Sequence, residues 1–309
     1  MTIALNILPI FLVIAIGIGA QKTGFLPSEF LGPGNRLAFY IAIPAMLFRA
    51  IALTPLEDAI STGLIAICLA ALGSGWLATS VISARLFSGR RGSSRASWIQ
   101  GATHGNQGIL GLAVVVYGLG PAATGVAGLL TAVIIVGQNT LSVFTFNRWG
   151  VGRQPKGSLL KKTLSNPIII STVAGLLFAL SPLRMAGFID RTLQIVGGMG
   201  LPLALMMTGA VLADTRRGQI QLIEMGLLSG IKLLALPSLG LLLMLMAGIT
   251  GLPGIVLLVL LSSPSATLCV VMANEMGGDA RLASTAISVT HALSALSYLL
   301  WLSLGSRLL

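Results

Sequence analysis

Charged side chains are scarce in this chain of 309 residues, of which only 9% are Asp, Glu, Lys or Arg. A soluble domain typically carries about 25% charged residues, so the composition excludes an ordinary water-soluble enzyme and a disordered chain. Acidic residues are the scarcest, with eight Asp and Glu against nineteen Lys and Arg. In their place, 55% hydrophobic residues and a mean hydropathy of +0.95 indicate that lipid is the main solvent.

Cysteine is also rare, and several chemical motifs are absent from the sequence. Cys68 and Cys269 both lie inside apolar runs, where they behave as small hydrophobic residues rather than as a disulfide or a metal pair. There is no G-x-x-x-x-G-K-[ST] loop, which excludes an ATP-driven pump within this chain. Despite the net charge of +11, the cations stand in short loops between apolar runs. We therefore expect no nucleic-acid partner, no metal and no cofactor.

Apolar runs long enough to cross about 30 Å of hydrocarbon recur along the whole chain. They are too long for transmembrane strands and show no alternation. The sequence predicts an all-α integral membrane protein in a lipid bilayer. We place ten spans near residues 3–21, 36–53, 59–86, 97–118, 122–147, 166–182, 190–213, 222–249, 253–276 and 281–304.

The distribution of Lys and Arg over the loops predicts the orientation. Fourteen of the nineteen cations fall on one side of the ten spans and four on the other, with Lys232 inside a helix. Because cytoplasmic loops carry the excess of Lys and Arg, the side with fourteen is cytoplasmic. Both termini are then outside, in a cytoplasmic (inner) membrane.

Prolines and glycines repeat at one fixed offset. The pairs Pro9/Pro167, Gly17/Gly175, Pro44/Pro202 and Gly120/Gly278 are each 158 residues apart, which indicates a duplication. Five spans in each half make the second copy enter the membrane upside down, as in inverted-repeat transporters. We expect one five-helix repeat over 1–148, a basic cytoplasmic linker over 149–164 and an inverted repeat over 165–309.

The fourth span of each half carries a predicted interruption. In the first half, Gly105 and Gly108 would let the backbone unwind. In the second half, Pro264 cannot continue a helix, and Ser263 before it is a candidate N-cap for a half-helix that begins with the proline. Such a helix end favours an anion, with a carboxylate as the natural candidate.

Polar side chains at these interruptions are the candidate substrate ligands. Asn106 and Gln107 could donate to substrate oxygens or satisfy freed carbonyls. The other candidates around the interruptions are His104, Ser265, Thr267 and Asn139. The alternative is a pair of kinked helices that pack through small residues and bind nothing.

Five polar residues within the spans have a functional and a structural interpretation each. His104 could titrate with the substrate or be a satisfied structural histidine, whereas we favour packing for His291. Lys232 could serve substrate binding or gating, or its side chain could reach the membrane interface. Gln138 and its neighbour Asn139 could face the interruption or hydrogen-bond between helices.

The order and spacing of several motifs resemble the auxin efflux carrier family, which includes plant PIN-type carriers and bacterial malonate- and malate-type carriers. The stretch Asn106-Gln107-Gly108-Ile109-Leu110-Gly111-Leu112 is similar to the N-x-G-x-x-G-L motif of the family's fourth span. The other matching segments are Leu8–Phe11, Gly24–Pro27, Asn35–Leu37, Ile43–Phe48, Asn166-Pro167, Leu201–Leu205, Lys232-Leu233 with Pro237, and Ser263–Ser265 through Asp279.

The resemblance implies a ten-helix carrier with crossed, broken helices four and nine that moves organic anions by an elevator-like or rocking motion. It also implies a scaffold related to bile-acid symporters and sodium/proton antiporters. Many members have proline where this chain has Ala113, so glycine alone would hold the first crossover open. The short loop over 148–164 fits a bacterial form.

The leading function is secondary active or potential-driven transport of a small carboxylate such as malonate, malate or an auxin-like acid. One alternative is an ion-coupled (Na⁺ or H⁺) symporter or antiporter, although the eight acidic residues all fall near span ends or in loops. Another is an intramembrane hydrolase that uses Ser263 and His104, without any G-x-S-x-G or H-E-x-x-H motif. The substrate, the direction, the coupling ion and assembly as a homodimer stay open.

Overall fold

The computed structural model describes residues 2–54, 62–89, 92–151, 165–214 and 221–309. Over these ranges the chain is helical, and the one strand-like feature within them is an isolated antiparallel bridge between Gly105 and Ser265. A helix satisfies its backbone N–H and C=O groups internally, which lipid demands because it offers no hydrogen-bond partners. The predicted all-α class is confirmed.

Seven helices of the described part are long and apolar enough to cross a membrane. They are Leu5–Lys22, Ser28–Ala52, Thr62–Leu86, Pro121–Trp149, Gly187–Ala213, Leu222–Met246 and Ala280–Leu308. Three apolar helices are shorter, at Gln107–Leu119, Pro167–Ala179 and Leu252–Leu261. These three fall in the predicted fourth, sixth and ninth spans. The total of ten spans therefore stays a prediction.

The second span begins earlier than the sequence analysis places it. Helix α2 (Ser28–Leu37) runs through a π-helical segment, Ala38–Ala42, into α3 (Ile43–Ala52). The helix thus starts at Ser28 rather than near residue 36. Pro27 enters it in an extended conformation. The apolar pattern misses these first turns because they contain charged side chains together with glycine and proline.

Pro44 and Pro237, which belong to the segments that resemble the carrier family, each follow a π-helical turn. Ile43 directly precedes Pro44, and its N–H bonds the carbonyl five residues back, that of Ala38. Leu236 directly precedes Pro237 and donates in the same way to Ile231. A proline has no N–H, and its ring crowds the preceding turn. The wider π-turn accommodates the ring without ending the helix.

Contacts divide the chain into two compact units that do not coincide with the two sequence halves. Unit 1 comprises the described parts of Met1–Thr62, Gly108–Val133 and Leu160–Asp214. Unit 2 comprises those of Gly63–Gln107, Ile134–Leu159 and Thr215–Leu309. Each unit takes segments from both halves of the sequence. The division into repeats at 149–164 stays a prediction.

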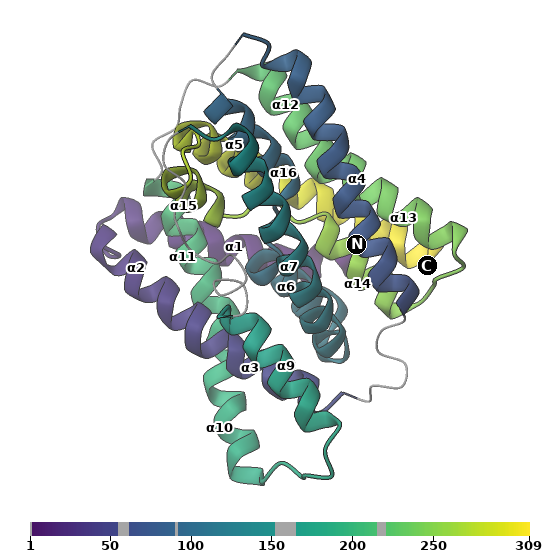
Figure 1. Cartoon of the computed structure of the whole chain (residues 1–309). Helices are drawn as coiled ribbons and strands as arrows, with labels where there is room; N and C mark the ends of the chain where they lie inside the picture. Colours follow the sequence, from purple (N-terminus) through teal and green to yellow (C-terminus); the bar gives the residue numbers. More distant parts are fainter. Residues whose placement is uncertain (1, 55–61, 90–91, 152–164, 215–220) are drawn as a thin grey trace. The chain divides into compact units, whose positions relative to one another are not determined.

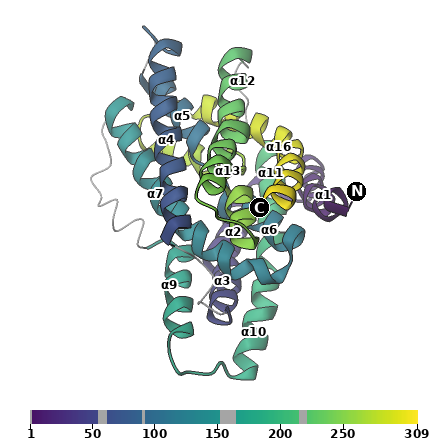
Figure 2. The same ribbon diagram turned by 90° about the vertical axis from the view of Figure 1, so that its right-hand side faces the viewer.

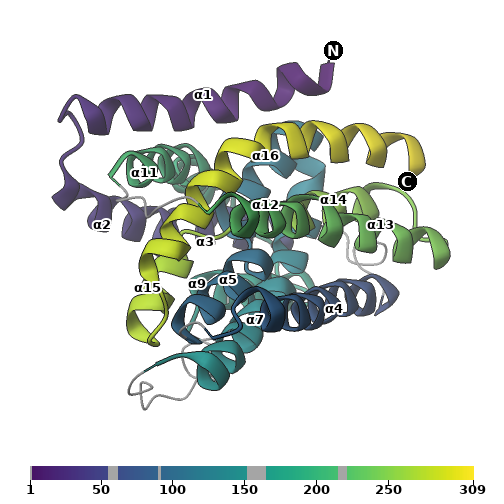
Figure 3. The same ribbon diagram turned by 90° about the horizontal axis from the view of Figure 1, so that it is seen from above.

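Unit 1 is held together by helices that touch through glycine. Helix α1 (Thr2–Lys22) lies along α11 (Gly200–Asp214), as Figure 3 shows. A Cβ atom on Gly17 would collide with the carbonyl oxygen of Met206, and one on Gly209 with that of Ile14. The two backbones are therefore close enough to exclude any side chain at these positions.

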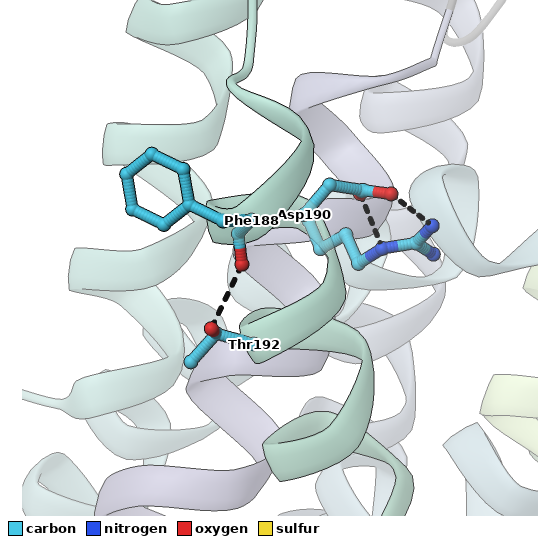
Figure 4. A network of polar contacts seen from close by, with 4 residues as sticks. Phe188, Asp190 and Thr192 are labelled. Carbon is cyan, nitrogen blue, oxygen red and sulfur yellow. Dashed lines mark hydrogen bonds and ion pairs between the residues drawn. The ribbon is translucent and has the colours of Figure 1, made fainter.

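The other part of unit 1 centres on α3. It packs against α9 (Pro167–Ala179) and α10 (Gly187–Gly198), which Figure 1 shows beside it. Arg49 of α3 forms an ion pair with Asp190 of α10, at 2.7 Å between Nε and Oδ1 and 3.1 Å between Nη2 and Oδ2. Figure 4 shows this pair beside the hydrogen bond from Thr192 to the Phe188 carbonyl.

Unit 2 is built around the last helix, α16 (Ala280–Leu308). The other helices of unit 2 are α4 (Thr62–Leu86), α5 (Gly92–Thr103), the later part of α7 (Thr124–Trp149), α12 (Leu222–Gly230), α13 (Leu236–Met246), α14 (Leu252–Leu261) and α15 (Leu268–Glu275). Helix α16 contacts α5, α12, α14 and α15. Figure 2 shows it beside α12 and α13. The interruptions between α5 and residue 107, and between α14 and α15, both lie in this unit.

Candidate functional site

The first interruption follows α5, which ends at Thr103. Residues 104–106 leave the helix, a π-helical segment runs over Gln107–Gly111, and α6 (Leu112–Leu119) continues from it. Gly105 lies within the non-helical residues and Gly108 within the π-helical segment. These are the glycines at which the sequence predicts unwinding. The interruption needs no proline at Ala113, which lies inside α6.

The second interruption corrects the predicted helix start. Helix α14 ends at Leu261, and α15 begins only at Leu268, with Thr267 as its N-terminal neighbour. Pro264 therefore does not open a half-helix, and Ser263 is not its N-cap. The Ser263 hydroxyl instead accepts a hydrogen bond from the Tyr298 hydroxyl at 3.1 Å. Extended pairing with the first interruption holds this stretch out of the helix.

The two interruptions are joined by backbone hydrogen bonds. The N–H of Asn106 donates to the carbonyl of Pro264 at 2.7 Å, and the N–H of Ala266 donates to the carbonyl of His104 at 3.0 Å. Between them lies the antiparallel bridge of Gly105 with Ser265. Asn106 and Pro264, which share one offset in the predicted repeat, are thus direct partners. We call residues 104–106 and 262–267 the crossing.

Side chains satisfy the carbonyls that the broken helices leave free. The hydroxyl of Ser265 donates to the carbonyl of Gly101 at 2.6 Å, and the amide of Gln138 donates to that of Thr103 at 3.0 Å. The ammonium of Lys232 donates to the carbonyl of Leu261 at 3.2 Å. The last carbonyls of a helix have no intrahelical donor, and leaving them bare in an apolar interior is costly. These contacts let the two helices end inside the unit.

Lys232 is fully inside the protein, with only 1% of its surface exposed. Its ammonium therefore does not extend along the surface of the protein, as it would have to if the side chain reached out toward the membrane interface. The side chain comes from the π-helical segment Ile231–Ala235 that follows α12. The ammonium lies at the C-terminal end of α14, where the partial negative charge of a helix end favours a cation.

Both histidines of the chain are buried in unit 2. The Nδ1 atom of His104 is 2.9 Å from the hydroxyl of Ser142. In His291, Nδ1 is 2.9 Å from the carbonyl of Ile287. A carbonyl can only accept, so Nδ1 of His291 carries the proton, and its neutral ring has an accepting Nε2. The Nδ2 atom of Asn106 is 3.4 Å from that Nε2.

This contact places His291 at the crossing, whereas its position in the sequence predicts only packing. It orients the amide of Asn106 so that the carbonyl oxygen points away from the histidine. Asn106 and His291 are 185 residues apart. No local pattern in the sequence links the two, so this partner could not have been found from the sequence.

Some buried polar atoms have no hydrogen-bond partner, such as the side-chain oxygens of Gln100 and Gln138, and among the described residues Gln107 is the one in which both side-chain polar atoms lack a partner. Its side chain is 1% exposed, yet neither its amide nitrogen nor its carbonyl oxygen has a hydrogen-bond partner. A buried amide without partners costs about 1–3 kcal/mol. Native proteins leave few such groups, and those they leave call for an explanation.

The remaining candidates lie at the margins of the crossing. Gly108 is half-buried in the π-helical segment. It is the residue at which the chain passes from unit 2 into unit 1. Thr267 and Asn139 are also half-buried. It is Gln138, next to Asn139 on α7, that contacts the end of α5. Among the described residues, no group of three or more His, Cys, Asp or Glu could hold a metal ion.

The crossing gathers hydrogen-bond donors. Amide and ammonium donors lie in the apolar interior of unit 2 and can recognise a polar or anionic ligand. The pair that a hydrolase would use is arranged differently: the hydroxyl of Ser263 contacts Tyr298, and His104 contacts Ser142. Neither contact forms a nucleophile–base pair between Ser263 and His104.

Comparison with known proteins gives matches over nearly the whole chain. Residues 2–302 match the model of a family described as membrane transport protein. A protein of Rhizobium meliloti (strain 1021) named "putative malonate transporter" is 25% identical over 295 residues, which cover 93% of this chain and 91% of that protein. An uncharacterized transporter of Methanothermobacter thermautotrophicus is 25% identical over 304 residues, 96% of each chain.

Proposed function

Because the chain belongs to the membrane transport family of the auxin efflux carriers, and is a transporter rather than an enzyme, we propose that it carries small organic anions by alternating access around the crossing. The observation that supports this proposal most directly is the pair of backbone hydrogen bonds that joins Asn106 to Pro264 and Ala266 to His104. Irregular backbone at membrane depth is tolerated where protein surrounds it or where it lines a cavity. In secondary transporters, such discontinuous helices form the substrate site.

The proposed membrane arrangement follows from the spans and the loop charges. Ten helices form two inverted five-helix repeats over 1–148 and 165–309, joined by the basic linker over 149–164. Both termini lie outside the inner membrane of a bacterium. The asymmetry of Lys and Arg between the loops supports this orientation.

The proposed substrates are small carboxylates such as malonate, malate or auxin-like acids. The donors at the crossing support an anion, since Asn106, Gln107 and Lys232 all present N–H groups there. The relative named as a malonate transporter supports the same class at 25% identity. The proposed ligands also include His104, Ser263, Ser265 and the backbone at Gly105 and Gly108.

The test is uptake of radiolabelled malonate, malate and indole-3-acetate into proteoliposomes, with Asn106→Ala as the variant. This change keeps the backbone bond to Pro264 but removes the amide that contacts His291. A lost hydrogen bond to a charged group predicts a KM increase of about tenfold for the transported acid.

Asn147→Ala is the matched control, because Asn147 is exposed at the end of α7. It should leave uptake unchanged. Unchanged KM and rate in Asn106→Ala would remove this residue from the site. Absence of uptake of all three acids by the wild-type protein would overturn the proposed substrate class.

A further inference from the structure

We propose that Lys232 and Gln107 form a subsite for one carboxylate group directly over Gly105. This inference rests on the proposed function and assigns the recognition of the anionic group to two specific side chains. The segments that supply these side chains are 125 positions apart in the sequence. Both side chains are within unit 2 and converge on the same space at the crossing.

The first observation is an incompletely used cation. Lys232 is 1% exposed and has three N–H donors, of which the carbonyl of Leu261 accepts one at 3.2 Å. Within the described residues, no carboxylate forms an ion pair with this ammonium. A buried charge is costly unless it is paired and hydrogen-bonded. The free N–H groups therefore favour an anionic partner.

The second observation is independent of the first. Both polar atoms of the Gln107 side chain lack a partner although the side chain is buried. The ammonium of Lys232 cannot accept a hydrogen bond from the amide nitrogen, because both groups are donors. An acceptor placed between the two donors would satisfy the ammonium of Lys232 and the amide nitrogen of Gln107. A carboxylate has two acceptor oxygens and no donor, so it fits this requirement.

Gly105 brings the two donors together. A Cβ atom built on Gly105 would lie 2.7 Å from Nζ of Lys232 and 2.7 Å from Nε2 of Gln107. Both donors thus approach the same point over the glycine backbone. Any larger residue would fill that point and push the donors away. The glycine accordingly has a second role besides allowing the helix to unwind.

The charge of the subsite determines the ligand class. A carboxylate beside Lys232 favours the charged form of the lysine. One ammonium pairs with one carboxylate, so the recognised unit is one carboxylate group, and the rest of the molecule can vary. Amides and methyl esters of the same shape lack the negative charge. The subsite should therefore bind an acid far more tightly than its neutral amide.

The main experiment measures binding to the purified full-length protein by thermal shift. Malonate, malate and indole-3-acetate are each compared with the corresponding amide in wild-type and Lys232→Met proteins. We expect wild-type protein to prefer the acid by at least about tenfold in Kd, the scale of a charge-assisted hydrogen bond. Lys232→Met should lose this preference. Lys22→Met, at the exposed end of α1, is the control and should retain it.

Gln107→Met separates binding from folding. Because the Gln107 side chain has no protein partner, replacing it with an apolar side chain of similar length should raise the melting temperature without ligand. The same variant should bind the acid several-fold more weakly. A residue with a purely structural role would lower the melting temperature and leave the preference for the acid intact.

The outcomes distinguish the two proposals. If the wild-type protein transports an acid, but Lys232→Met and Gln107→Met keep the full preference for acid over amide, the subsite is wrong and the proposed function stands. If the wild-type protein neither transports nor binds any of the three acids, both fall. Loss of the preference in both variants, with Lys22→Met unchanged, supports the subsite.

Discussion

Units 1 and 2 use glycine in opposite ways. In unit 1, Gly17 and Gly209 bring the backbones of α1 and α11 into contact while both helices stay intact. In unit 2, Gly105 lies where the helix is interrupted, and polar groups fill the space over it. Small residues in a membrane helix therefore do not by themselves identify a functional site. What matters is whether the backbone beside them keeps its helical hydrogen bonds.

Polar contacts divide in the same way. In the described part of unit 1, the side chains of Arg49 and Asp190 form an ion pair that is about one-third exposed on each side. In unit 2, buried hydroxyl, amide and ammonium groups bond the carbonyls at the crossing. In the interior of a membrane protein, a polar side chain is retained when it hydrogen-bonds backbone groups that an interrupted helix leaves without a partner.

The first of the two largest expected effects tests the close packing in unit 1. Gly17→Ala puts a methyl group against the Met206 carbonyl, so we expect about 1–3 kcal/mol of destabilisation from overpacking. Gly19→Ala is the matched control on the same helix, because nothing lies within 4 Å of its Cβ position. It should be neutral or slightly stabilising. Thermal unfolding in detergent measures both. Equal melting temperatures would contradict the close contact.

The second prediction tests the satisfied carbonyls in unit 2. Ser265→Ala removes the donor to the Gly101 carbonyl and leaves that buried acceptor bare. We expect a loss of about 1–3 kcal/mol in stability and slower carboxylate uptake. Ser306→Ala, whose exposed hydroxyl bonds its own helix, should change neither. A variant as stable and as active as wild type would show that Ser265 is dispensable.

The smallest effect concerns the partly exposed ion pair. Arg49→Met should cost about 0–1 kcal/mol, because solvent screens the pair at the surface of unit 1. Any loss should shrink as salt is raised. A double-mutant cycle with Asp190→Asn measures the coupling by thermal unfolding. A coupling energy well above this range would mean that the pair locks α3 to α10 more tightly than its exposure suggests.

The sequence predicted the features that local chemistry determines. The lack of charge and the apolar runs predicted an all-α membrane protein, and the matched family model confirmed the resemblance to auxin efflux carriers. The chain leaves the helix at 104–106, beside the glycines, because a residue without a side chain weakens a helix locally. The predicted start of the second span, near residue 36, was wrong because the apolar pattern does not include the polar first turns of α2.

Features that depend on long-range contacts could not be predicted. Ser263 and Pro264 have the local pattern of a helix start, yet Pro264 accepts a backbone bond from Asn106 and stays out of the helix. The interest of His291 and Gln107 depends on their neighbours in the folded protein: His291 contacts Asn106, and Gln107 lies near Lys232 over Gly105. The bonds from Ser265 to Gly101 and from Asn106 to His291 join residues 164 and 185 positions apart.

The position of Lys232 has one consequence for energetics. Its ammonium is hydrogen-bonded to the end of α14, so any positive charge at the crossing belongs to the protein chain itself. Under the proposed function, the negative charge of one bound carboxylate group would therefore be compensated by a side chain of the protein.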